Sequence, residues 1–352
     1  MKEFWSARAR SLTPYVPGEQ PQGRTFIKLN TNENPYPPAP AALAAIRAAA
    51  DGTLRLYPDP ECAALRQALA ETYGLRPENV FVGNGSDEVL ALCFQAFFDP
   101  GREILFPDVT YSFYPVFAQL YGLGYREVPL NDDFSLPLEP FLGGNGGVVI
   151  ANPNAPTGQA VGLDAIRALL EGNPQSVVLV DEAYVDFGAA SAVELVKAYP
   201  NLVVVQTMSK SRALAGLRVG YALADENLIA ALHSVKNSFN SYTLDRLALA
   251  GAAGALSEPG YLRQTAEKIV ATRARTTAAL RAMGFQVADS AANFLFVSHP
   301  AAAAKTLLDG LRARGILVRW WDKPRISNHL RITVGTDGEM DALCAALKEL
   351  LP

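Results

Sequence analysis

The sequence is poor in cysteine and histidine, with three of each in 352 residues. Cys62, Cys93 and Cys344 are far apart and odd in number. They match neither a disulfide framework nor a zinc-binding pattern, so we expect free thiols in a reducing compartment. The histidines are equally scattered, and the sequence therefore predicts no metal site.

Long apolar runs and dense clusters of basic residues are also missing. No run of about 18 apolar residues occurs, which predicts no membrane span. The N-terminal residues lack the apolar core of a signal peptide. The formal net charge of −4 provides no electrostatic case for binding nucleic acid. We expect a cytoplasmic protein that binds neither membranes nor nucleic acid.

The sequence does contain enough apolar residues, 49%, for an ordinary globular protein. Between residues 80 and 224, short apolar runs alternate with amphipathic helical segments. This alternation predicts an α/β fold with a mostly parallel sheet between helices. Short strands and helices after residue 284 indicate a smaller α+β domain. We predict a large domain over 37–257, a small domain over 258–352, and an N-terminal arm, 1–36, that joins the small domain.

A single lysine, Lys210, follows the predicted strand 202–206 and lies between Ser209 and Ser211. Such a lysine can form a Schiff base with an aldehyde cofactor such as pyridoxal phosphate, and Arg218, eight residues further on, could hold the phosphate. An isolated Ser-Lys pair, however, more often marks a surface loop. The choice between these interpretations depends on the rest of the chain.

Other polar residues also fall at the ends of predicted strands, where open parallel sheets bind their ligands. Ser86 opens a helix after a glycine-rich turn, which suits either a phosphate or a helix cap. Asp181 follows a buried strand and needs a partner, either a protonated pyridine nitrogen or a turn that it caps. Tyr184 could donate to a ring oxygen, and Tyr111 could stack on a flat cofactor. We place Tyr111 at the start of a helix over 111–121.

Two arginines lie at strand-like positions in the predicted small domain. Arg319 and Arg331 could together bind one phosphate or carboxylate, although each alone would more often be solvated. Trp320 and Trp321 follow the first arginine directly. They either influence the choice of substrate ring or, as we favour, pack into the core of the small domain.

Three motifs occur in a fixed order: Asn-Pro-x-x-Pro-Thr-Gly at 152–158, Asp-Glu-Ala-Tyr at 181–184 and Ser-Lys-x-x-x-Leu-Ala-Gly-Leu-Arg-x-Gly at 209–220. Their ordered combination resembles the fold-type I, class II pyridoxal-phosphate-dependent aminotransferases. Segments at 12–19, 29–35, 57–59, 83–88 and 330–336 are similar to the members of this family that act on histidinol phosphate. The resemblance covers about residues 11–350 and implies a homodimeric aminotransferase of histidine biosynthesis with pyridoxal phosphate as its cofactor.

Carried over position by position, the resemblance implies a role for each cofactor-binding residue. Lys210 would form the Schiff base and move the substrate proton. Asp181 would pair with the pyridine nitrogen, Tyr184 would bond the ring oxygen O3′, and Tyr111 would stack on the ring. The cofactor phosphate would be surrounded by Ser86, Asp87, Ser209 and Arg218.

The resemblance also implies the substrate contacts. Arg319 and Arg331 would hold the anionic end of either substrate, the phosphate of histidinol phosphate or a carboxylate of glutamate. Tyr15 and the region of Asn32 would close over the substrate. Tyr57 would reach the cofactor phosphate of the neighbouring subunit, so the two active sites of a dimer would be shared.

The chain departs from the family pattern at Ala155, where an asparagine usually bonds O3′. Either the preceding Asn154 takes over this bond, or Tyr184 and water provide it. Three other activities remain open at this stage. They are an aromatic amino-acid aminotransferase, a decarboxylase of a phosphorylated amino acid and a non-catalytic regulator. The regulator is disfavoured because no basic helix-turn-helix stretch precedes residue 30.

Overall fold

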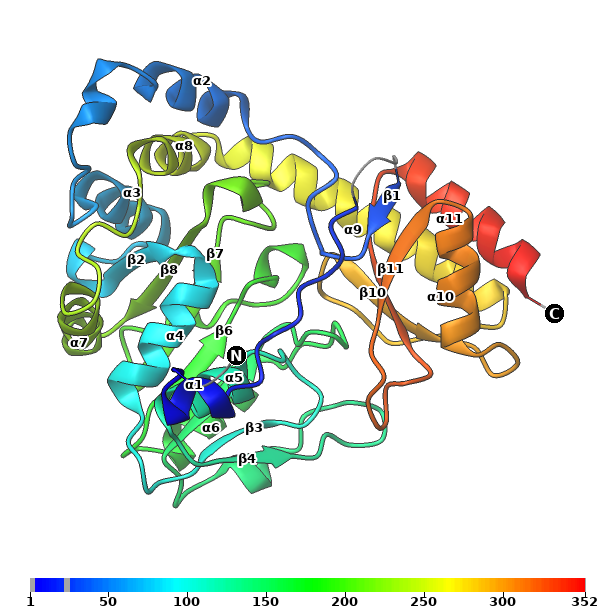
Figure 1. The fold of residues 1–352 in the computed structure, drawn as a ribbon, viewed down its shortest axis with the longest axis horizontal. Coiled ribbons are helices and arrows are strands. Elements are labelled where there is room, and N and C mark those ends of the chain that lie inside the picture. The colour runs from blue at the N-terminus through cyan, green and yellow to red at the C-terminus, as the bar shows by residue number, and fades with distance from the viewer. Residues whose placement is uncertain (1–3, 22–25, 352) are drawn as a thin grey trace.

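The computed structural model describes residues 4–21 and 26–351, which form a larger and a smaller domain, each built on its own β-sheet (Figure 1). The larger sheet has seven strands in the order β2-β8-β7-β6-β5-β3-β4. These strands are β2 (Val80–Asn84), β3 (Ile104–Pro107), β4 (Tyr125–Val128), β5 (Gly147–Ala151), β6 (Val178–Asp181), β7 (Leu202–Thr207) and β8 (Val219–Ala224).

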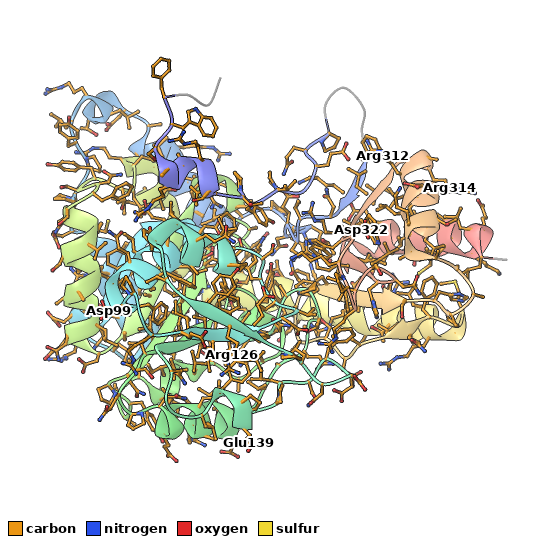
Figure 2. All side chains as sticks on the ribbon, turned by 60° about the horizontal axis from the view of Figure 1, so that its bottom comes forward. Asp99, Arg126, Glu139, Arg312, Arg314 and Asp322 are labelled. Atoms are coloured by element: carbon orange, nitrogen blue, oxygen red, sulfur yellow. The ribbon has the colours of Figure 1, made fainter. Side chains whose placement is uncertain are left out.

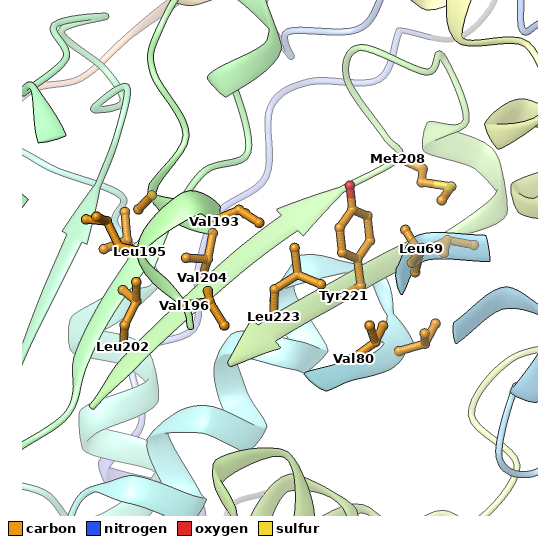
Figure 3. Close-up of a cluster of buried hydrophobic side chains, with 14 of the residues drawn as sticks. Leu69, Val80, Val193, Leu195, Val196, Leu202, Val204, Met208, Tyr221 and Leu223 are labelled. Carbon is orange, nitrogen blue, oxygen red and sulfur yellow. The ribbon is translucent and has the colours of Figure 1, made fainter. Parts of the chain in front are cut away.

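Five of the seven strands, β3 to β7, pair in parallel, whereas β8 runs antiparallel to both β2 and β7. Side chains of β7 alternate between two cores, since Val204 faces one and Val203 faces the other. Figure 3 shows Val204 beside Leu223 and Tyr221 on the first of these faces. The sheet is thus buried on both sides, as predicted for a mostly parallel sheet between helices.

Helices cover both faces of this sheet. The first face packs against α3 (Ala63–Tyr73), α6 (Leu163–Gly172) and α8 (Arg246–Leu256), with α2 (Pro40–Ala49) lying outside α8. The opposite face packs against α4 (Gly85–Phe97), α5 (Tyr114–Tyr121) and α7 (Glu226–Asn237). Six 3₁₀ turns connect the described elements: Gly52–Arg55, Pro77–Asn79, Glu139–Phe141, Val185–Phe187, Ala192–Leu195 and Ala215–Leu217.

The smaller sheet has five strands in the order β1-β11-β12-β10-β9. Its elements are β1 (Ile27–Leu29), β9 (Gln286–Val287), β10 (Phe294–Ser298), β11 (Ile316–Trp320) and β12 (Leu330–Thr333), with helices α9 (Pro259–Ala282), α10 (Ala304–Ala313) and α11 (Asp337–Leu350). The helix α11 begins with a reciprocal capping box between Thr336 and Glu339. This α+β unit completes the predicted fold class.

The N-terminal segment joins the two sheets. It contains a short helix that the sequence did not indicate, α1 (Ala7–Ser11), whose first turn is capped by Ser6 and none of whose residues is buried. From α1, beside the large domain, the chain runs to β1, which pairs in parallel with β11 (Figure 1). We propose a boundary after residue 36, which the pairing of β1 with β11 supports, and a second boundary after residue 257, just before α9 begins at Pro259.

One predicted helix begins later than expected. The helix expected over 111–121 starts at Tyr114, and Tyr111 lies in the turn before it, where its carbonyl accepts from the N–H of Tyr114 at 3.2 Å. Pro115 explains the later start because it lacks an N–H and fits best in the first turn of a helix. Tyr111 is therefore held at the strand end, not on a helix face.

Charged side chains lie on the outside of both domains. Figure 2 labels Asp99, Arg126 and Glu139 on the large domain and Arg312 and Arg314 on the small one, all of them exposed. Among the described residues, none of the helices combines the length and the apolar character that crossing a membrane requires.

Candidate active site

A cavity of about 300 Å³ lies where the carboxyl ends of the large sheet face the N-terminal segment and the small sheet. It collects residues from all three parts of the chain. Of the residues predicted for the site, those that line the cavity are Tyr15, Asn32, Ser86, Asp87, Tyr111, Asp181, Tyr184, Ser209, Lys210, Arg218, Arg319 and Arg331. Asn154 and Tyr57 do not line it.

Lys210 enters the cavity from the loop that follows β7. Its Nζ donates to the carbonyl of Thr31 at 3.2 Å and lies 5.8 Å from the centre of the Tyr184 ring. Asn34 fixes the backbone of this loop, since its Nδ2 donates to the carbonyls of Lys210 and Ser211, both at 3.0 Å. The amine is therefore anchored at its base, while its tip contacts the carbonyl of Thr31 and the Tyr184 ring at the cavity wall.

Asp181 ends β6, and its side chain is buried. One carboxylate oxygen accepts from the Tyr114 hydroxyl at 3.0 Å, and the other accepts from the N–H of Ala183 at 3.2 Å. Both donors are neutral, and removal from water raises the pKa of Asp181 to about 6. A cation beside this carboxylate would offset the cost of burying its charge, as a protonated ring nitrogen does.

Opposite Asp181, the first turn of α4 and the residue Arg218 form a cradle for an anion. Gly85 begins α4 with a φ of +80°, and a Cβ there would lie 2.5 Å from the Arg218 guanidinium. A Cβ on Gly220 would lie 2.3 Å from the N–H nitrogen of Ser86. The glycines thus allow the guanidinium and the strand β8 to approach the positive end of the helix dipole, which favours a phosphate.

Ser209, which also lines the cavity, is held by short local contacts. Thr207 accepts from the N–H of Ser209 at 3.1 Å and donates to the Ser209 hydroxyl at 3.0 Å. Asp87, in the first turn of α4, accepts from the Tyr111 hydroxyl at 2.7 Å and lies 3.4 Å from the Arg218 guanidinium. The contacts of Asp87 with Tyr111 and Arg218 fix the Tyr111 ring beside the cavity, where the ring can cover a flat ligand.

Two guanidinium groups line the small-sheet side of the cavity. Arg331 is half-buried; one of its nitrogens donates to the carbonyl of Asn30 at 2.9 Å, while its Nε is buried and has no partner among the described residues. Burial also lowers the pKa of Arg331. Arg319 donates to the carbonyls of Val16 and Pro17 at 2.9 and 3.3 Å. A half-buried cation with a buried, unused donor is suited to an anionic ligand.

Aromatic side chains surround this end of the cavity. The Tyr15 ring, carried by the N-terminal segment, stacks on Phe113 with centres 4.3 Å apart. Trp321 lies next to both arginines, with their Cζ atoms 5.3 and 5.2 Å from its ring centre. Trp320 instead packs against the small-domain core and donates to the carbonyl of Ser327 at 2.7 Å. Our interpretation of both tryptophans as core residues thus fits Trp320. Trp321 also packs against a buried apolar cluster, which contains Phe296 and Ile326, but it lies beside the two arginines as well.

Asn154 lies outside the cavity, and its side chain is hydrogen-bonded to other residues. Its Nδ2 donates to the carbonyl of Val109 at 2.9 Å and to Thr157 at 3.1 Å, while its Oδ1 accepts from Thr110 at 2.7 Å. These contacts do not favour Asn154 as the replacement for the missing asparagine. The side chain that does line the cavity at this loop is Ala155.

Sequence reasoning missed two contacts within the site. Tyr114 is fully buried in the core, but its hydroxyl also donates to Asp181. Asn32 was expected to contact substrate, yet its Nδ2 donates to the Tyr184 hydroxyl at 2.9 Å. Neither pairing has a signal in the sequence, because the partners are 67 and 152 residues apart.

Together, the amine, the buried carboxylate and the cradle fit a flat ring that carries an aldehyde, a basic nitrogen and a phosphate. Pyridoxal phosphate has these groups, and Lys210, Asp181 and Arg218 are placed to meet them in turn. The fold and this site together define the class of pyridoxal-phosphate-dependent aminotransferases.

Comparison with known proteins agrees with this class. Residues 24–347 match the family described as aminotransferase class I and II. The chain is 52% identical to the histidinol-phosphate aminotransferase of Clostridium acetobutylicum, with full coverage of both chains. It is 56% identical to that of Marinomonas sp., over 99% of this chain and all of the relative. A crystal structure of histidinol-phosphate aminotransferase from Sinorhizobium meliloti with pyridoxal-5'-phosphate superposes with a TM-score of 0.90 at 29% identity, covering 99% and 97% of the two chains.

The chain belongs to the aminotransferase class I and II family and, within it, to the histidinol-phosphate aminotransferases.

Proposed function

We propose that this enzyme interconverts L-histidinol phosphate and 2-oxoglutarate with imidazole acetol phosphate and L-glutamate. One observation carries the choice of substrate: Arg331 and Arg319 stand together on the small-sheet side of the cavity, and the Nε of Arg331 is buried without a partner among the described residues. A phosphate requires more positive charge than a carboxylate, and the pair of arginines supplies it. The same pair accepts a carboxylate of glutamate in the other half of the reaction.

Each residue of the site has its own role in transamination. Bound pyridoxal phosphate supplies an electron-withdrawing ring that accepts the electron pair left when the substrate Cα loses its proton. Lys210 Nζ takes that proton from the Cα of the amino donor and returns a proton to the Cα of the product in the second half-reaction. Asp181 holds the ring nitrogen in its charged form, and Arg319 and Arg331 hold the substrate so that Cα lies within reach of Lys210.

Tyr15 and Phe113 cover the substrate end of the cavity. Burial raises the pKa of Tyr15, so its hydroxyl stays protonated and can donate to the substrate. The N-terminal segment that carries Tyr15 is tied to Arg319 through the carbonyls of Val16 and Pro17. Binding of an anion by Arg319 therefore also orders this N-terminal segment, which covers the site and excludes water from it.

We further propose a homodimer with shared sites, located in the cytoplasm. Tyr57 is 77% exposed and stacks on Tyr242 with ring centres 4.6 Å apart. Leu54, Leu56 and Phe239 are also exposed, so the apolar side chains form a surface that a second subunit can bury. Tyr57 of one subunit would then reach the phosphate cradle of the other. The three free cysteines agree with a reducing compartment.

The visible absorption of the bound cofactor tests the substrate assignment. The purified holoenzyme is titrated separately with histidinol phosphate, phenylalanine and tyrosine, and the loss of the visible band is followed. We expect histidinol phosphate to act at a concentration at least about tenfold below that of either aromatic amino acid. A stronger response to phenylalanine would favour an aromatic amino-acid aminotransferase instead.

A further inference from the structure

The loop at Ala155 leaves one ring oxygen of the cofactor without the usual asparagine. Ala155 packs in an apolar cluster with Ala292, Phe294 and the ring of Tyr184. The Tyr184 and Phe294 rings meet edge to face at 5.0 Å and 90°. The alanine therefore helps to hold the Tyr184 ring, but it cannot donate a hydrogen bond.

Asn32 holds the hydroxyl end of the same tyrosine. The residue is 1% exposed and adopts a φ of +57°. Thr333 accepts from the backbone N–H of Asn32 at 3.0 Å and donates to its Oδ1 at 3.1 Å. The side-chain Nδ2 is thus left facing Tyr184, to whose hydroxyl oxygen it donates at 2.9 Å.

This direction of donation determines what the Tyr184 hydroxyl can do. A phenol has one hydrogen, and its oxygen accepts from a donor through a lone pair. Because the Asn32 amide donates to the Tyr184 oxygen, it occupies a lone pair of that oxygen and leaves the phenolic hydrogen free to donate elsewhere. Tyr184 lines the cavity beside Lys210 and Asp181, so this hydrogen is available to the ligand.

We propose that Asn32 is a positioning residue, which directs the Tyr184 hydrogen to the ring oxygen of the cofactor and so compensates for the missing asparagine at position 155. The inference rests on the proposed cofactor site and concerns residues of this chain alone. It also links the two domains, because Thr333 and Asn293 of the small domain hold Asn32 in place, the latter by donating to its carbonyl at 3.0 Å.

The experiment follows the pKa that governs the visible absorption band of the holoenzyme. A donor at the ring oxygen stabilises its negative charge and lowers this pKa. Four proteins are titrated: wild type, Asn32→Gly, Tyr184→Phe and the double variant. Glycine is chosen because it accepts the positive φ of Asn32 without strain. Cofactor affinity of each protein is measured by titrating its apo form with pyridoxal phosphate.

We expect Asn32→Gly and Tyr184→Phe each to raise this pKa by about one unit. In the Tyr184→Phe background, Asn32→Gly should cause no further rise, since the hydroxyl through which it acts is gone. Cofactor affinity should fall in parallel with the rise in pKa. Thr333→Val, which frees the amide without removing it, should raise the pKa less than Asn32→Gly does.

An unchanged pKa in Asn32→Gly, or an equal rise with and without the Tyr184 hydroxyl, would overturn the proposal. If Asn32→Gly does not fold, Thr333→Val decides in the same way, alone and combined with Tyr184→Phe. Failure of the proposed function would look different, because wild type would then lack either the visible band or its response to histidinol phosphate.

Discussion

Arg319 and Arg331 stand directly opposite each other in the antiparallel register of β11 and β12. Like charges in such a pair repel each other, which usually destabilises a sheet. Here the indole of Trp321 lies close to both guanidinium groups and offers each a cation–π contact. The sheet register thus places two positive charges at one end of the cavity, and a substrate anion relieves their repulsion.

Replacing Trp321 tests this arrangement. Trp321→Leu removes both aromatic contacts, so we expect the KM for histidinol phosphate to rise about tenfold while kcat changes less than about twofold. Trp321→Phe should give an intermediate KM. Steady-state kinetics measure both constants. Trp320→Leu is the matched control, because the Trp320 indole packs in the small-domain core. This variant should lower the melting temperature without raising KM. A higher KM in Trp320→Leu than in Trp321→Leu would contradict our account.

Replacing Lys210 tests the central chemical assignment. Lys210→Ala removes the amine that links the cofactor and carries the proton, so turnover should fall by at least about 10³-fold. The cradle around Arg218 remains, and we therefore expect pyridoxal phosphate to bind still, with an altered absorption spectrum. Lys197→Ala, at an exposed position, should retain wild-type rates. Near-normal transamination by Lys210→Ala would show that another group does this work.

The buried carboxylate of Asp181 predicts a pH dependence of apoenzyme stability. Its pKa rises from an ordinary value of 3.8 to about 6 in the fold, so the folded state binds more protons than the unfolded state between these values. The contribution of Asp181 to stability is therefore greatest below the ordinary pKa and falls as the pH rises to about 6. The difference between the two pKa values corresponds to about 3 kcal/mol in the contribution of Asp181 to the free energy of unfolding.

Urea unfolding between pH 3.5 and 7 of the apoenzyme and of Asp181→Asn measures this effect. The pKa of Glu182 is also raised by burial, to about 7, and it contributes to the slope of both proteins. The comparison should therefore use the difference between the two curves, which we expect to decline with rising pH. A difference that does not vary with pH would contradict our claim that burial raises the pKa of Asp181.

Shared active sites predict complementation between two inactive variants. Tyr57→Ala lacks the group that reaches the neighbouring site, and Lys210→Ala lacks the amine of its own site. In a mixed dimer, one of the two sites combines an intact Lys210 with an intact Tyr57 of the partner subunit. We expect each variant alone to be impaired and the co-refolded mixture to recover activity. Absence of recovery in a verified mixed dimer would exclude sharing through Tyr57.

The sequence by itself determined the class of the fold and predicted which residues meet at the cofactor site. Strands with apolar residues on both faces alternate with amphipathic helices, and local periodicity suffices to indicate a doubly covered sheet. Lys210, Asp181 and Ser86 each follow a predicted strand, so the rule that ligands bind at carboxyl ends of strands places them together. The ordered motifs at 152–158, 181–184 and 209–220 then indicated the family.

Only the tertiary structure decided which side chains touch. Asn32 meets Tyr184, Tyr114 meets Asp181, and Arg319 meets Trp321 and Arg331 because of strand register, helix start and domain packing. These relationships depend on long-range pairings, which leave no periodic trace in the chain. The start of α5 at Tyr114 is different, because Pro115 is a local signal for the first turn of a helix. The hydrogen bond from Asn154 to Val109 belongs with the long-range contacts, since short-range sequence patterns do not report hydrogen bonds between loops.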